Sequence, residues 1–218
     1  MKLTHPYYLE PIEITEETPV TLIIERGDHF RRFVSELIVQ TKTGIGDFVL
    51  SEGNEIIALN KNAIVISDVL DLDFDSRPIK TRLLQEIVPD CDEEQINEII
   101  NSLNLLGATI TNKSKYSLTF NMNLSTNDLL KILDFQFDTE TYSDVERIFE
   151  YIEICAELLG KKPIFIVGLK DLLTDEEFLE IKKLVEYKKQ PVFLIEHRQH
   201  RTDDRDHSRI IDEDLCSI

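Results

Sequence analysis

The chain has 218 residues, of which 42% are hydrophobic, and it carries a formal net charge of −18 at pH 7. This composition supports one large domain, or a domain with an appendage, and argues against long disorder. The acidic balance, taken alone, disfavours nucleic acid or an anionic membrane as a partner.

Cysteine usage and hydropathy indicate the compartment. Cys91, Cys155 and Cys216 are odd in number and contain no CxxC pair, which argues against a disulfide framework or a paired-cysteine zinc site and fits a reducing cytoplasm. The N-terminal stretch lacks the apolar segment of a signal peptide, and no apolar run approaches the ~20 residues that span a bilayer. We therefore expect a soluble, cytoplasmic protein without membrane contact.

The first predicted elements have the outline of a phosphate-binding unit. Residues 20–24 are predicted to form a buried strand, a polar turn follows at 25–28, and apolar residues then recur at helical spacing up to residue 38. The turn has one glycine, Gly27, and no Gly-Lys-Ser/Thr, while Glu25 and Asp28 would repel a phosphate. We expect an ordinary turn in which Asp28 caps the helix, and no bound nucleotide.

The next segments predict β-structure followed by helices. Short β-rich runs between residues 48 and 66 alternate with Gly and Asn turns and indicate a hairpin or meander. The motif "DLDFDS" at 71–76 is not a calcium loop, because Ser76 and Arg82 stand where such a loop needs Gly and Glu. Its acids instead precede a helix predicted over 77–88, which Ser76 can cap.

The middle of the chain predicts a second helix and a less regular stretch. An apolar stripe indicates a helix over 92–106, and Gly107 is expected to end it. Further along, "YSLTFNMNL" alternates like a strand, and "STNDLLKIL" is typical of a short helix.

The second half gives the clearest pattern. Ser143 with Glu146 and Thr174 with Glu177 form capping boxes, each opening a helix of regular apolar period, the second over 175–189. Apolar runs at 163–167 and 191–196 predict buried strands, so the alternation indicates a parallel sheet. The expected fold is an α/β head domain built from residues 1–75 and 140–218, with a mainly helical leg inserted at 76–139.

Two groups of residues are candidates for chemistry. His197, His200 and His207 lie near Asp203, Asp204 and Asp206, but the segment is polar and follows the last expected strand, which favours a solvated loop over a metal or nuclease site. Seven lysines lie between residues 161 and 189, and arginines follow. The helix dipole alone explains lysines late in a helix, and a contact surface for the DNA backbone is the functional alternative.

Several motifs in fixed order resemble one known family. They are "LEPIEI", "LIIERGDHFRRFV", "VISDVLDLDFDS", "KKPIFIV", "LTDEEF", "PVFLIEHR" and "IIDEDL". The ordered set is similar to the type II-A CRISPR-associated adaptation proteins of the Csn-two family, in their short form. The resemblance covers almost the whole chain and is weakest over about 108–137.

The resemblance implies a fold and a role. Family members have a parallel-sheet head similar to a degenerate P-loop ATPase, with an α-helical leg, and assemble as homotetrameric rings that hold double-stranded DNA ends. They act in spacer acquisition, an antiviral defence, beside the CRISPR integrase proteins and the RNA-guided nuclease of the locus, and they are not enzymes. The candidate phosphate contacts here are Lys161, Lys162, Lys170, Lys182, Lys183, Lys188, Lys189, Arg198 and Arg201.

The resemblance also implies calcium, held by carboxylates in the middle region. In this chain the candidates are Asn121, Asn123 and Asp128, and the two amides carry less charge than the expected acids. An alternative acidic group comprises Asp90, Asp92, Glu93 and Glu94.

Two other functions stay open. A residual nucleotide-binding switch would bind ATP at residues 25–28, and an interaction scaffold would bind partner proteins without affinity for DNA.

Overall fold

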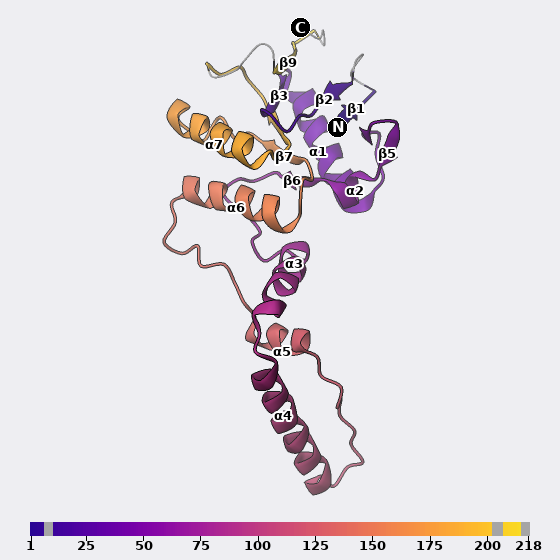
Figure 1. Ribbon diagram of the computed structural model, residues 1–218. Coiled ribbons are helices and arrows are strands. Elements are labelled where there is room, and N and C mark those ends of the chain that lie inside the picture. Colours follow the sequence, from indigo (N-terminus) through magenta and orange to yellow (C-terminus); the bar gives the residue numbers. More distant parts are fainter. Residues whose placement is uncertain (7–10, 202–206, 215–218) are drawn as a thin grey trace. The chain divides into compact units, whose positions relative to one another are not determined.

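The computed structural model describes residues 1–6, 11–201 and 207–214 and divides into two compact units (Figure 1). The head joins Met1–Asp73 to Thr139–Ile218, and the leg is Phe74–Asp138. These boundaries lie within two residues of those expected from the sequence, and the leg is an insertion between two parts of the head.

A five-stranded sheet forms the centre of the head. Its strand order is β6-β7-β8-β3-β9, and every pairing is parallel, which confirms the predicted parallel sheet. The strand predicted at 20–24 lies inside the sheet, between β8 and β9. The strands are β3 (Val20–Ile24), β6 (Ile64–Ile66), β7 (Ile164–Val167), β8 (Val192–Glu196) and β9 (Ser208–Ile211).

A second, antiparallel sheet has the order β2-β1-β4-β5. The predicted hairpin is its β4–β5 pair, but the third run of the predicted meander, β6, joins the parallel sheet instead. A short helix, α2 (Leu59–Asn62), separates β5 from β6 and redirects the chain. The strands are β1 (Lys2–Thr4), β2 (Ile12–Glu13), β4 (Val49–Glu52) and β5 (Glu55–Ile57).

Helices cover both faces of the parallel sheet. Helix α1 (Gly27–Thr43) buries Phe33 and Leu37 against Leu22 and Phe193. The chain crosses the sheet in one direction from β3 through α1 to β6, and in the opposite direction from β6 to β7 and β8. These later connections contain α6 (Asp144–Leu158) and α7 (Asp175–Lys188). Right-handed crossovers therefore place α6 and α7 on the face opposite to α1. The two helices pack against each other, as Figure 1 shows. Both predicted capping boxes are present at their N-termini.

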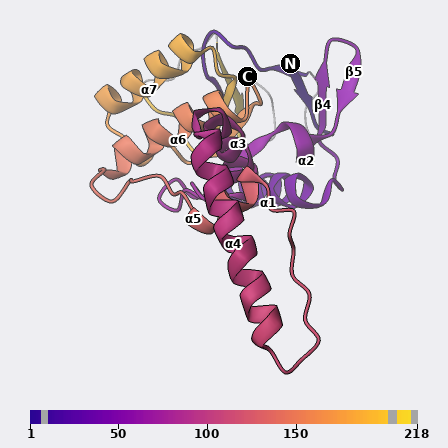
Figure 2. The same ribbon diagram turned by 60° about the horizontal axis from the view of Figure 1, so that its bottom comes forward.

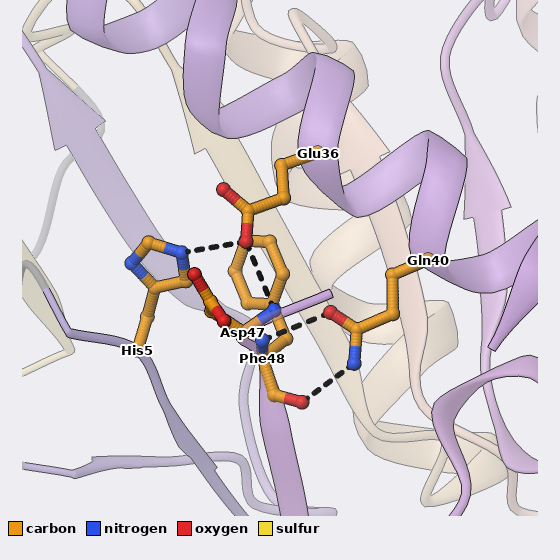
Figure 3. Close-up of polar contacts among 5 residues, drawn as sticks. All are labelled: His5, Glu36, Gln40, Asp47 and Phe48. Carbon is orange, nitrogen blue, oxygen red and sulfur yellow. Dashed lines mark hydrogen bonds and ion pairs between the residues drawn. The ribbon is translucent and has the colours of Figure 1, made fainter. Parts of the chain in front are cut away.

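A polar clamp joins α1 to the antiparallel sheet (Figure 3). The buried amide of Gln40 donates to the carbonyl of Phe48 at 2.7 Å and accepts from its N–H at 2.9 Å. One oxygen of Glu36 lies 3.2 Å from Nε2 of His5 and accepts from the N–H of Asp47 at 3.0 Å. The clamp therefore satisfies backbone groups that the start of β4 leaves unpaired.

The leg consists of helices and an irregular segment, residues 114–125, which we call the return segment. Its helices are α3 (Arg77–Ile87), a 3-10 turn (Val88–Asp90), α4 (Glu93–Lys113) and α5 (Thr126–Leu133). Figure 2 shows the return segment running back from the far end of α4 toward α5.

Three predictions for the leg were wrong. Gly107 does not end α4, which continues to Lys113. The glycine instead makes room for the Phe120 ring, because a Cβ built on Gly107 lies 2.6 Å from Cε2 of Phe120. Residues 116–124 form no strand, since they pack along α4 rather than beside another strand. Ser76 occupies the N-cap of α3, but its side chain makes no capping hydrogen bond.

Candidate nucleic-acid interface

The turn after β3 has the shape of a phosphate-binding turn without its donors. Helix α1 begins at Gly27, and the N-cap residue, Arg26, makes no side-chain cap. Asp28 does not cap the helix as expected. Its carboxylate instead accepts a hydrogen bond from Nε of Arg26 at 2.8 Å, and this bond lowers the pKa of Asp28. The positive charge of Arg26 is therefore paired with Asp28 within the turn itself.

The chain itself packs against this turn. Nδ1 of His197 lies 3.1 Å from the carbonyl oxygen of Ile24, and its ring lies 5.2 Å from that of Phe30. A Cβ built on Gly27 would be 3.5 Å from the His197 ring. The start of α1 is therefore in contact with a side chain from the end of β8. It lacks the glycine-rich loop and lysine that phosphate binding requires.

Lys170 is the one predicted contact residue that the structure places in the interior, with 5% of its surface exposed. Its Nζ donates to Oγ1 of Thr21 at 3.2 Å and lies 4.5 Å from the centre of the Phe178 ring. Its backbone N–H donates to the Glu196 carboxylate at 3.1 Å. This burial could not be predicted from the sequence, because it depends on α7 packing over the sheet. Such a side chain cannot reach a DNA phosphate at the surface.

The other eight candidates do not form one patch. In a parallel sheet, residues before the strands and residues after them lie at opposite edges. Arg198 and Arg201 follow β8 and belong to the carboxyl edge of the sheet. Lys182 and Lys183 lie on α7, between the edges. Before β7 and β8 lie the residues of what we call the amino-edge group: Lys161, Lys162, Lys188 and Lys189.

Some of these eight candidates form ion pairs with acidic residues of the same chain. Nζ of Lys161 lies 2.6 Å from Glu16, and Nε of Arg198 lies 2.7 Å from Asp171. Nζ of Lys188 donates to Glu153 and, at 2.7 Å, to Glu157 on α6, and these bonds raise the pKa of Lys188. Lys182 approaches Glu186 at 4.0 Å. Within the described part of the chain, ion pairs are absent at four candidates: Lys162, Lys183, Lys189 and Arg201.

Two exposed arginines are not among the predicted contacts. Arg31 and Arg32 are exposed on the first turns of α1, next to the carboxyl edge. A hydrogen bond of 3.3 Å from Gln199 to Glu25 joins the turn after β8 to the start of this region. The adjacent arginine pair in "DHFRRF" is the sequence signal that could indicate them.

Two histidines of the histidine-rich segment, His197 and His200, contact other parts of the head. His197 packs on α1, and only 15% of the His200 side chain is exposed, with Nε2 lying 3.2 Å from Asp171. Residues 208–211 pair with β3 as strand β9, which the polar sequence before Ile210 did not suggest. Asp203, Asp204 and Asp206 lie outside the described residues.

The three calcium candidates of the leg make local bonds instead of a shared cage. Oδ1 of Asn121 accepts from the N–H of Asn123 at 2.9 Å. Asp128 closes the capping box of α5 through Ser125 and also accepts from Lys131. In the alternative acidic group, Asp92 caps α4. Calcium prefers six to eight oxygens with several carboxylates, so Asn121, Asn123 and Asp128 fit it poorly.

Comparisons with known proteins place the chain in a family. The model of the family described as CRISPR-associated protein (Cas_Csn2) matches residues 40–215. The chain belongs to this family. The fold is similar to a crystal structure of Stu0660 of Streptococcus thermophilus, with a TM-score of 0.64 and 15% identity over 96% of this chain and 74% of that one. No curated protein matches it.

Membership ties the chain to the CRISPR system, and the family works in its adaptation stage. At 15% identity, the likeness to Stu0660 concerns the fold alone. Among the described residues, no helix is both long and apolar enough to cross a membrane.

Proposed function

We propose that the protein is a non-catalytic, double-stranded DNA-binding component of CRISPR type II-A spacer acquisition. It acts in the cytoplasm as a homotetrameric ring that holds linear DNA by its ends, beside the integrase proteins and the RNA-guided nuclease of the locus. Its membership of the Cas_Csn2 family supports the adaptation role. The DNA-end contact, the ring and the partners are the finer parts of the proposal.

The observation that carries the proposal is a contrast between the cation at the nucleotide-like turn, which is ion-paired, and exposed cations elsewhere on the head, which are not. At the turn after β3, where a nucleotide would bind, Arg26 is paired with Asp28 and His197 packs on the helix start. Elsewhere on the head, exposed cations such as Lys183, Lys189 and Arg201 have no ion pair with another described residue. The available charge thus suits an extended polyanion better than a small phosphate.

A ring-shaped assembly would explain how a protein of acidic composition can bind DNA. The formal charge of −18 repels a duplex from most of the surface. If the exposed cations of each copy face a shared channel, four copies focus their field on one duplex while acids face solvent. Binding should then favour duplexes with free ends, because a closed circle cannot thread through a closed ring.

The test measures binding of the purified chain to a linear duplex and to the same sequence as a closed circle, at rising salt, with and without Ca²⁺. We expect binding to the linear form, little sequence preference and affinity that falls steeply with salt. Light scattering should give a mass of four chains. Failure to bind linear duplex at low salt would contradict the proposal.

Paired variants identify the edge that faces DNA. Lys162→Gln/Lys189→Gln removes two cations of the amino-edge group, and Arg198→Gln/Arg201→Gln removes two at the carboxyl edge. The pair that contacts phosphates should weaken binding to all sequences and lower the salt slope by about 1 per lost contact. Lys42→Gln/Lys61→Gln, on α1 and α2, matches both in charge and should leave the slope unchanged.

The two alternatives predict different outcomes of these measurements. Saturable ATP binding that is lost on changing residues 25–28 would favour the nucleotide switch. A tetramer or partner complex without DNA affinity would favour the scaffold.

A further inference from the structure

Three potential metal ligands meet at the carboxyl edge of the parallel sheet, at the end of β8 and in the segments that follow β7 and β8. They are Asp171, Glu196 and His200, and one ligand atom from each lies within 4.8 Å of the other two. In residues 1–6, 11–201 and 207–214, this is the one such group of three. Ligands of open α/β sheets bind at this edge, outside the carboxyl ends of the strands.

The fold holds these residues by its backbone. Glu196 is the last residue of β8, the middle strand, and is fully buried. The segment after β7 is fixed beside it, because Gly168 donates to the carbonyl of Ile195 at 3.0 Å and the N–H of Lys170 donates to the Glu196 carboxylate at 3.1 Å. Asp171 follows directly. His200 returns to the same place four residues after Glu196.

The burial of the three side chains forms a gradient from the interior to solvent. Glu196 is wholly buried, the His200 side chain is 15% exposed, and the Asp171 side chain is 38% exposed. The group is thus closed on the protein side and open on the solvent side, where water molecules can complete a coordination sphere.

We propose that Asp171, Glu196 and His200 bind one divalent transition-metal ion, of the Zn²⁺ or Mn²⁺ class. Imidazole and carboxylates together suit these ions, whereas Ca²⁺ and Mg²⁺ prefer oxygen ligands alone. The ion ties the segment after β7 to the segment after β8 at the edge where a nucleotide would bind in a phosphate-binding protein. The site involves none of the leg residues considered for calcium.

Arg198 is the competitor of the ion. Its Nε donates to Oδ1 of Asp171 at 2.7 Å, the same oxygen that lies 3.2 Å from Nε2 of His200. A metal ion must displace this guanidinium or use the second carboxylate oxygen. Replacing Arg198 should therefore strengthen metal binding, which separates the proposal from a purely structural role of the three side chains.

The experiment uses tag-free, full-length chain stripped of metal by a chelator. Calorimetric titration with Zn²⁺ or Mn²⁺ should show one ion per chain, and Co²⁺ bound in a four- or five-coordinate protein site should give visible d–d absorption stronger than that of the hydrated ion. Ca²⁺ should not compete at equal concentration. His200→Ala and Asp171→Asn should each lower the affinity at least ~10-fold, as losses around metal sites do, and Arg198→Gln should raise it.

Controls separate ligation from folding and from adventitious binding. Glu180→Gln removes an exposed acid of α7, and His29→Gln removes a histidine of α1; both should bind like the unaltered chain. Glu196→Gln changes a buried group, so circular dichroism must first show that it folds. Absence of saturable binding, or unchanged affinity in His200→Ala and Asp171→Asn, would overturn the proposal whether or not the chain binds DNA.

Discussion

The parallel sheet of the head and helix α4 of the leg bury their apolar side chains to very different extents. In β7 and β8, Phe165 and Phe193 have no exposed surface, and their ring centres lie 5.4 Å apart. Helix α4 buries none of its residues, and Leu105 is 71% exposed. The head is thus held by distant segments packed together, while α4 relies on local hydrogen bonds, its Asp92 cap and one packed segment.

The largest test of this contrast is the loss of a core ring. Phe193→Ala should lower the free energy of unfolding by about 3–5 kcal/mol, because it removes a fully buried side chain and leaves a cavity. Leu105→Ala, at an exposed position of α4, should change it by no more than about 0.5 kcal/mol. Urea unfolding measures both.

A large loss in Leu105→Ala would break the comparison. It would mean that another copy of the chain or another surface covers this face of α4 in solution. Repeating the unfolding at several protein concentrations would then identify self-association, since its contribution grows with concentration.

The polar clamp of Figure 3 should give an intermediate effect. Gln40→Ala removes both hydrogen bonds to the backbone of Phe48 and leaves those groups without their partner. We expect a loss of about 2 kcal/mol, within the usual cost of unsatisfied buried groups. Val39→Ala, one position away on an exposed side of α1, is the matched control. Equal unfolding curves for the two variants would show that the clamp contributes nothing.

The smallest expected effect concerns α4. Alanine favours a helix interior over glycine by about 1 kcal/mol, but at Gly107 its Cβ would meet the Phe120 ring. Gly107→Ala should therefore gain less than this amount in the unaltered chain and the full amount in a Phe120→Ala background. A double-mutant cycle measures the coupling. Zero coupling would mean that the return segment does not pack on α4.

The sequence predicted the elements whose signals are local. The capping boxes at Ser143 and Thr174 form because all their atoms lie within four consecutive residues. The apolar run of β3 was assigned with its observed limits, Val20–Ile24, because a strand buried on both faces needs no alternation. The fold class followed from these elements.

The missed features depend on partners that are distant in the sequence. Gly107 is a helix terminator by local statistics, and only the packing of Phe120 shows why a glycine stands inside α4. Strand β9 has a polar start and becomes a strand because the edge of β3 is available. Lysine is usually a surface residue, but α7 covers Lys170. Charge counts along the chain likewise could not show that the predicted DNA contacts fall at two edges of a sheet.

The position of β3 has a consequence for how the protein is made. Its partners are residues 193–196 on one side and 208–211 on the other, almost the whole chain away. During synthesis from the N-terminus, β3 leaves the ribosome early and waits with both edges unpaired. The contacts within 74–138 can form first, although this unit is an insertion. The exposed edges of an apolar strand invite aggregation, so slow translation of the last third of the chain should lower the yield of folded protein.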